Sequence, residues 1–469
     1  MRRTLRPTVG LALAASLSAG LAACTLSPAY HRPDLPVSRA WPVATPDSPP
    51  ADAAPPAWRD MFPDPRLQQL IALALTQNRD LRVAMGNIEK ARAQYGVSRA
   101  ALLPSLALSG SETRARTPAS VSLSGQAYTA SEYSAQLGFT AYELDLFGRV
   151  RSLSEAARQS YLATAEDRRT AQISLIAQVA GSDLQLAADL QLLALSRDTF
   201  KARDESRRIL QLQFDHGAAS QLDLAQADGL AQQARSDVAA ATARVEQDRN
   251  ALRLLLGADL PKALEPDPDV ASVAIRRDLT VGLPSMVLTA RPDVLSAEHQ
   301  LRAQNADIGA ARAAFLPQIS LTGSAGQESA ALGGLFDGGN GTWSFSPRVS
   351  LPIFSGGANL ANLDSARAGR KIAVAQYEKA IQTAFREVAD QLAVRAVIDE
   401  ELAAQRQQVQ SARLSLTLSQ ARYDRGLDTY LLLLDAQRTL YAAQQTLVST
   451  ELAESTNRVN LYKTLGGGG

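Results

Sequence analysis

Few side chains in this 469-residue chain could carry out covalent or metal chemistry. It has one cysteine, Cys24, and three scattered histidines, His31, His216 and His299. A single cysteine excludes an intrachain disulfide framework and a cysteine-rich metal site, and isolated histidines leave little for a histidine-based one. The glycine-rich stretch 338–341 lacks the strand-to-helix context of a phosphate-binding loop, and no nucleophile triad is recognisable. We therefore predict no enzymatic activity, no metal and no cofactor.

The position of Cys24 indicates a lipid-attachment site. Three arginines within residues 2–6 precede an apolar run at 9–21, which is typical of a secretory signal peptide and too short for a spanning helix. The run ends in Leu-Ala-Ala-Cys24, which resembles the bacterial lipobox, whose cysteine becomes the acylated first residue of the mature protein. A plain signal peptide with a chance cysteine is the alternative. Thr25 follows where an aspartate, in similar lipoproteins, would favour inner-membrane retention, so we expect the outer membrane.

Charge and length set further limits. The 48 basic and 47 acidic residues leave a net charge of +1, which suggests neither nucleic-acid binding nor a strongly charged partner. The length is enough for two or three ordinary domains with ample core.

Two blocks of the sequence occur twice. Residues 214–257 align with 423–466, and residues 78–110 align with 291–323. In both blocks, some of the aligned positions carry the same residue, and these are spread along the whole block. The duplicated unit of about 210 residues is far longer than solenoid repeats. The chain is therefore two copies of one large structural unit.

In each copy the helical period gives way to an alternation of apolar and polar residues, which predicts a β-hairpin at about 105–145 and another at about 318–353. Strands of about 9 to 12 residues match the length of a tilted strand crossing a bilayer, although a soluble sheet is the alternative. Four strands cannot close a barrel, because the known minimum is about eight, so closure requires several subunits. The residues that we expect to face lipid are Tyr133, Leu137, Phe139, Trp343, Phe345 and Val349.

The longest helical stretches follow the hairpins. Residues 149–213 and 358–422 contain no proline, and each would span roughly 95 Å at 1.5 Å per residue. In the returning helix of the second copy, Leu434, Tyr441 and Val448 lie on one seven-residue grid, which predicts coiled-coil pairing.

These patterns predict a mainly helical protein with a β-barrel contribution. Gly217 and Gly426 lie in the short turns between paired helices, where each is suited to a left-handed conformation. The expected order is a signal peptide (1–23), an extended arm (24–66), a first repeat (67–257, long helices about 149–256), a connector (258–285), a second repeat (286–466, long helices about 358–465) and a frayed tail (467–469).

Four stretches carry a family resemblance: CTLSPAYHRPDLPV, ELDLFGRVRS, SLPIFSGG and RYDRGLDTYLLLLDAQRTL. The chain resembles the outer membrane factors, the exit ducts of tripartite efflux pumps and type I secretion systems, and within them the NodT-type lipoprotein branch. The resemblance covers nearly the whole mature chain. It implies a homotrimer with a twelve-stranded barrel in the outer membrane, continued by a helical tunnel through the periplasm. It also implies two partners, a periplasmic adaptor and an inner-membrane transporter of the RND type.

The resemblance further implies a gate at the periplasmic end, where leucine and aspartate rings narrow the bore. The first copy carries Gln226 and Gly229 at the positions of Asp435 and Arg438, so we expect no equivalent latch there. An ordinary solvated pair between Asp435 and Arg438 is the alternative. The matching gate residues in this sequence are Leu431, Asp435, Arg438 and Tyr423.

The resemblance places adaptor docking at the turns around Gly217 and Gly426. The resemblance therefore implies that this protein is a passive conduit, which exports substrates delivered to it by a pump. The alternatives are the outer membrane component of a type I secretion system, a periplasmic coiled-coil adaptor, and a lipoprotein enzyme. An adaptor would carry small β domains beside one helical hairpin, and an enzyme would need a polar constellation that this sequence lacks.

Overall fold

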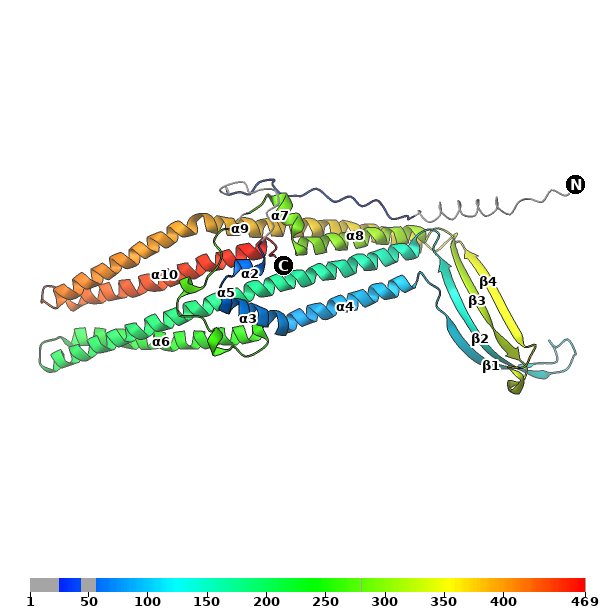
Figure 1. Ribbon diagram of the computed structural model, residues 1–469, viewed down its shortest axis with the longest axis horizontal. Coiled ribbons are helices and arrows are strands. Elements are labelled where there is room, and N and C mark those ends of the chain that lie inside the picture. The colour runs from blue at the N-terminus through cyan, green and yellow to red at the C-terminus, as the bar shows by residue number, and fades with distance from the viewer. Residues whose placement is uncertain (1–24, 44–55, 280, 469) are drawn as a thin grey trace. The chain divides into compact units, whose positions relative to one another are not determined.

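The computed structural model describes residues 25–43, 56–279 and 281–468, so Cys24 and the expected signal peptide lie outside them. Helices and strands follow one another in two similar rounds along the chain (Figure 1). The elements are α2 (Trp58–Met61), α3 (Pro65–Gln77), α4 (Arg79–Ala100), β1 (Ala107–Thr117), β2 (Tyr128–Leu144), α5 (Arg149–Asp215), α6 (Gln221–Leu256), η1 (Lys262–Leu264), η2 (Val270–Ser272), α7 (Pro284–Ala290), α8 (Pro292–Ala313), β3 (Gln318–Ser329), η3 (Leu332–Gly334), β4 (Gly341–Ser350), α9 (Ala358–Tyr423) and α10 (Tyr430–Thr464).

The described residues form two compact units. Unit 1 contains all four strands, unit 2 contains both turns between the long helices, and α4, α5, α8 and α9 have residues in each. Unit 1 consists of the described residues within Met1–Asp34, Asn87–Ala165 and Ser296–Tyr377, and unit 2 of those within Leu35–Gly86, Glu166–Leu295 and Glu378–Gly469.

The strands form one antiparallel sheet in the order β1-β2-β3-β4 (Figure 1). Leu137 lies opposite Leu108 on one side and Ala325 on the other, and Ala325 lies opposite Trp343. Because successive strand residues point to opposite faces, these four side chains share one face. The predicted β-hairpin in each repeat is confirmed.

The second strand differs from the prediction. β2 has 17 residues, and its register with β3 shifts between Phe139 and Tyr142. An extra residue on one strand makes a β-bulge, and Ala141 within it has a φ of 53°. The Ala141 N–H donates to Oγ1 of Thr322 at 3.1 Å. Tyr142 therefore follows Phe139 on the apolar face, so the predicted alternation of apolar and polar residues is broken after Phe139.

The two long helices are confirmed. α5 has 67 residues and α9 has 66, as the absence of proline allows. At the turns that follow them, Gly217 has a φ of 74° and Gly426 a φ of 72°. A Cβ at either position would meet no atom within 4 Å. Glycine is therefore favoured because of the left-handed backbone conformation and not because neighbouring atoms leave no space for a side chain.

The returning helix α10 buries the predicted seam. Leu434, Tyr441 and Val448 are buried, seven residues apart. The next seam positions, Glu454 and Ser455, are polar yet also buried. Glu454 forms an ion pair with Arg458 one turn further on. The negative charge of Glu454 is therefore compensated, and the buried seam of α10 continues through this position.

Two expectations about the chain ends are wrong. Gly468 forms a parallel bridge with Ala57 and accepts a hydrogen bond of 3.1 Å from the Tyr462 hydroxyl, so residues 467 and 468 are not frayed. Glycine permits this approach, because a Cβ at 468 would clash with the Pro56 carbonyl. The arm expected to be extended over 24–66 contains the short helix α2 and the first two residues of α3.

Candidate channel-forming and gating sites

The sheet of unit 1 has one largely apolar face, which also carries Glu112, Arg114 and Arg116 toward the end of β1. Its register brings all six residues expected to face lipid onto this face. Leu137, Trp343, Phe345 and Val349 are each more than half exposed. Contiguous exposed apolar surface marks a membrane or protein contact, because it is costly to leave in water. The other two of the six, Phe139 and Tyr133, are half-buried. The Phe139 ring packs against Gly323, and the Tyr133 hydroxyl donates a hydrogen bond of 3.0 Å to Glu112.

The opposite face of the sheet carries hydroxyl groups. The Oγ atoms of Ser111 and Ser134 lie 2.8 Å apart across β1 and β2, and those of Ser324 and Ser344 lie 2.9 Å apart across β3 and β4. Cross-strand hydroxyl pairs of this kind suit a surface in contact with water. The sheet therefore has one largely apolar face and one face that carries hydroxyl groups.

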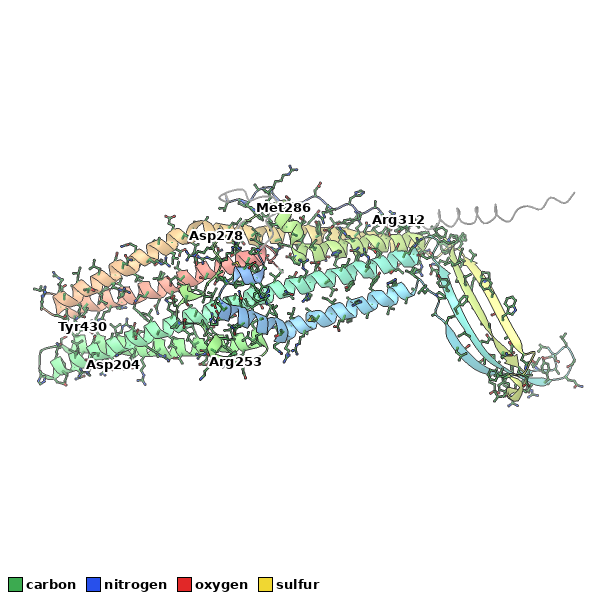
Figure 2. The ribbon with its side chains drawn as sticks, viewed as in Figure 1. Asp204, Arg253, Asp278, Met286, Arg312 and Tyr430 are labelled. Atoms are coloured by element: carbon green, nitrogen blue, oxygen red, sulfur yellow. The ribbon has the colours of Figure 1, made fainter. Side chains whose placement is uncertain are left out.

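The turns between the long helices lie together in unit 2. The rings of Tyr423 and Tyr430 are 5.5 Å apart, and Figure 2 shows Tyr430 at the start of α10. Burial, with Tyr423 nearby, raises the pKa of Tyr430 to about 12, and burial also raises the pKa of Tyr423. Both hydroxyls therefore remain protonated donors at neutral pH. Tyr423 packs on a buried group that we call the tip cluster, which consists of Leu210, Ala227, Tyr430, Leu433 and Leu434.

The other expected gate residues lie on the exposed side of α10. Leu431, Asp435 and Arg438 are all exposed, whereas Leu433 and Leu434 between them are buried in the tip cluster. Within the described part of the chain, no ion pair joins Asp435 to Arg438, and both the gate and the alternative of an ordinary solvated pair stay predictions. All three side chains are free to meet other molecules.

Sequence reasoning missed the interactions that shape the two turns. At the second turn, the Arg422 guanidinium makes two hydrogen bonds to Asp428, of 2.7 and 2.8 Å, across Gly426. At the first turn, Ser220 caps α6 and forms a capping box with Asp223. The Ser-x-x-Asp spacing could have revealed the cap, whereas the ion pair spans a turn and has no fixed spacing rule.

Two further observations concern membranes and metals. Among the helices of the described residues, none is both long enough and apolar enough to cross a membrane. Over the same described ranges, no three His, Cys, Asp or Glu side chains are grouped to hold a metal ion.

Two repeats of a β-hairpin and a long helical hairpin, with an amphipathic sheet, define a membrane channel with a helical extension. A family description, "Outer membrane efflux protein", matches residues 70–258 and 283–467, which correspond to the two repeats. The chain belongs to the outer membrane efflux protein family. It is an outer-membrane channel of an efflux pump and extends into the periplasm.

Individual relatives agree with this assignment. The chain is 47% identical to the probable efflux pump outer membrane protein TtgC of Pseudomonas putida, over 96% of this chain and 93% of that protein. It is 42% identical to the outer membrane protein OprJ of Pseudomonas aeruginosa, over 99% and 96%. Among solved structures, the open state of the Neisseria gonorrhoeae MtrE channel matches with a TM-score of 0.86 and 40% identity, over 95% and 98% of the two chains.

Proposed function

We propose that three copies of this chain form the channel, each contributing four strands to one twelve-stranded barrel. The observation that carries this proposal is the sheet itself: β1 and β4 have unpaired edges in the described residues, and one face is apolar. A spanning sheet with open edges leaves backbone groups unsatisfied in lipid, and closure takes about eight strands or more. The number three comes from the family resemblance.

Exposed apolar side chains on the helices support assembly as well. A single chain rarely exposes many such residues on helices of this length unless another subunit covers them. Those in question are Val83 and Val97 on α4, and Ile372, Val397 and Leu414 on α9, each more than half exposed.

Light scattering of the detergent-extracted protein tests the assembly. We expect about three times the mass of one chain after correction for bound detergent. In planar bilayers the same preparation should give single-channel currents. A monomeric particle that inserts and conducts would overturn the proposal, and so would a trimer that never conducts.

The partners are a periplasmic adaptor and an inner-membrane transporter of the RND type. The adaptor docks at the turns around Gly217 and Gly426, and the transporter supplies the energy, so this chain acts as a conduit without catalysis. Relatives named as outer membrane proteins of efflux pumps favour this assignment over a type I secretion system. A photo-crosslinker at His216 or Arg425, beside these glycines, should capture the adaptor, while one at exposed Lys90 on α4 should not.

The pump is inferred to export small organic compounds. Two relatives of 47% identity are named for the efflux of toluene and of antibiotics. Deleting the gene for this chain should increase susceptibility to such compounds, and complementation should restore resistance. Unchanged susceptibility together with loss of a secreted polypeptide would instead favour type I secretion.

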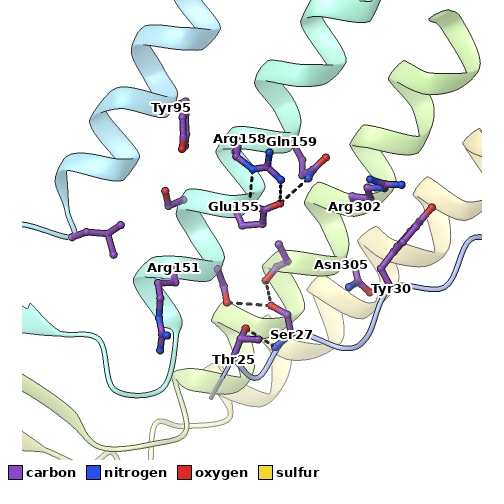
Figure 3. Close-up of a pocket in the computed structure, with 14 residues that line it drawn as sticks. Thr25, Ser27, Tyr30, Tyr95, Arg151, Glu155, Arg158, Gln159, Arg302 and Asn305 are labelled. Atoms are coloured by element: carbon purple, nitrogen blue, oxygen red, sulfur yellow. Dashed lines mark hydrogen bonds and ion pairs between the residues drawn. The ribbon is translucent and has the colours of Figure 1, made fainter. Parts of the chain in front are cut away.

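Cys24, which lies outside the described residues, is proposed as the lipidated first residue of the mature chain. Thr25 and the residues after it begin the described arm, which lies beside α5 and α8 in unit 1 (Figure 3). Metabolic labelling with an acyl analogue should mark the native protein and not Cys24→Ser. Because the barrel itself holds the protein in the membrane, the exported variant should remain inserted.

The periplasmic gate is proposed to consist of rings of Leu431 and Asp435 around the axis of the trimer. Both side chains are exposed on α10 and lie four residues apart, so they share a face. Three carboxylates near one axis repel each other, so hydrogen bonds or ion pairs must hold the closed state, with Arg438 and Tyr423 as donors.

A further inference from the structure

Unit 1 contains a cavity of about 690 Å³ beside the N-terminal arm (Figure 3). It is bounded by α4, α5, α8 and the arm residues Thr25, Ser27 and Tyr30. Nothing in the proposed channel function uses it. Its lining is rich in hydroxyl, amide and guanidinium groups.

The lining carries positive charge. Arg151, Arg158 and Arg302 line the cavity with one carboxylate, Glu155, which gives a net charge of +2 for the lining side chains. Arg158 donates its Nε and one Nη to Glu155, at 2.8 and 2.9 Å, which leaves further N–H groups of its guanidinium to bind a ligand.

Acidic residues behind the lining offset part of this charge, and one positive charge remains when Arg32, outside the lining, is counted with them. Asp145 pairs with Arg151, and Glu298 is shared between Arg302 and Arg32 of the arm. Counting these partners, four arginines face three carboxylates, so one positive charge remains uncompensated. An anion is the ligand that this balance favours.

Two buried polar atoms in the lining residues have no partner among the described residues. Asn305 is only 5% exposed; its Nδ2 donates to the Pro28 carbonyl at 2.7 Å, but its Oδ1 accepts no hydrogen bond. The Nε of Arg302 is likewise buried and donates to nothing. Buried polar groups are nearly always satisfied, so a ligand that offers both a donor and an acceptor would supply the missing partners once the lining side chains turn toward it.

The position of the cavity within unit 1 suggests where such a ligand comes from. α5 begins at Arg149, five residues after β2 ends at Leu144, and the α5 residues that line the cavity belong to its first three turns. The cavity therefore lies at the end of the sheet where the helices start, next to the residue that follows Cys24. If the sheet spans the bilayer as proposed above, this is the level of the lipid headgroups in the leaflet that faces the periplasm.

We propose that the cavity binds the headgroup of an anionic phospholipid with a hydroxylated head, such as phosphatidylglycerol. The phosphate oxygens accept hydrogen bonds from Arg158 and Arg302, and a headgroup hydroxyl donates to Oδ1 of Asn305. The site ties the arm, α5 and α8 to the membrane surface, in addition to any acyl chain on Cys24. Basic pockets at membrane surfaces recognise anionic lipids in this way.

The test uses the full-length, detergent-purified and delipidated protein in calorimetric titrations. Short-chain phosphatidylglycerol should bind at least about tenfold more tightly than short-chain phosphatidylcholine, as loss of charge-assisted hydrogen bonds predicts. Inorganic phosphate and glycerol, added separately, should bind weakly. Equal affinity for the two lipids would overturn the proposal, as would phosphate binding as tightly as phosphatidylglycerol.

Variants localise the binding. Arg158→Gln removes a proposed contact, and Ser154→Phe fills the cavity without changing charge, because Ser154 is buried in its lining. Both should weaken phosphatidylglycerol binding by about tenfold. The matched control is Arg367→Gln, which breaks a similar exposed i,i+3 pair with Asp364 away from the cavity and should bind lipid normally.

Other outcomes are equally informative. Unchanged lipid affinity in Ser154→Phe would place the lipid elsewhere and overturn the site. Loss of trimers in Ser154→Phe, with no phosphatidylglycerol binding to the native protein, would show that the cavity belongs to a subunit interface. Conductance is recorded for every variant, so failure of the channel proposal would appear as absent current whatever the lipid result.

Discussion

The guanidinium of Arg66, at the start of α3, donates to both carboxylate oxygens of Asp183 in α5, at 2.7 and 2.6 Å. The side chain of Asp183 is fully buried in the core of unit 2. Removing one member of a buried pair leaves an uncompensated charge. We therefore expect Arg66→Gln to lower the free energy of unfolding by about 3–5 kcal/mol, measured as a lower thermal midpoint in detergent. The exposed pair Arg208–Glu205 is the control, and Arg208→Gln should leave the midpoint nearly unchanged.

Two glycines of one helix should respond to alanine in opposite directions. Gly257 ends α6 with a φ of 65°, and a Cβ there would clash with the Gln77 carbonyl oxygen. Gly257→Ala should lower the free energy of unfolding by about 1–2 kcal/mol or more, because alanine disfavours the positive φ and its Cβ would clash with the Gln77 carbonyl oxygen. Gly229, inside α6, has open space around it, so Gly229→Ala should stabilise by roughly 0.5–1 kcal/mol. Equal shifts in the two midpoints would contradict this reading of the helix end.

The stability of unit 2 should depend on pH through Asp248. Burial, and then the neighbouring Asp189, raises the pKa of Asp248 from its ordinary value of 3.8 to about 7, while Arg244 opposes the shift. The folded state then holds a proton that the unfolded state releases between about pH 4 and 7, so stability falls as pH rises through that window. Asp248→Asn should flatten this decline. Parallel curves of thermal midpoint against pH, from pH 5 to 8, would show that Asp248 does not cause it.

The two faces of the sheet should tolerate charge differently. Phe139→Arg puts a guanidinium on the apolar face and should cost about 2–4 kcal/mol of insertion near the bilayer centre. Gln136→Arg and Ser134→Arg, on the hydroxyl-bearing face of the same strand, should cost much less, because that face meets water. The yield of heat-stable, membrane-inserted oligomer measures the difference. Similar yields for the two faces would indicate a soluble sheet.

The proposed gate should open when the hydrogen bonds or ion pairs that hold it closed are removed. Tyr423→Phe together with Arg438→Ser removes two proposed donors to neighbouring helices, and the tip should loosen. We expect higher single-channel conductance in planar bilayers, with a further increase for Leu431→Ala because the apolar ring widens. Changes at Gln226 and Gly229 are the controls and should do less. If conductance is unaffected in a correctly assembled trimer, these residues are ordinary helix surface.

The sequence by itself determined the features that depend on neighbours a few residues apart. The absence of proline over about 65 residues and the helical period set α5 and α9, and Gly217 and Gly426 set the turns that end them. Alternation of side chains set both hairpins, because the two faces of a strand follow directly from residue parity. The duplication and four short motifs were enough to indicate the family.

Tertiary structure decided everything that joins residues distant in the chain. Residue parity cannot foresee the bulge at Ala141, because the extra residue exists only relative to the partner strand β3. The docking of Gly468 on Ala57 and the pair Arg66–Asp183 depend on which segments meet in the core, and local pattern does not encode that. The cavity beside the arm is of the same kind, since its lining comes from four separate stretches of sequence. The spacing of residues along the sequence determines which side chains share a face of one helix or strand. Only the tertiary packing determines which other segments that face contacts.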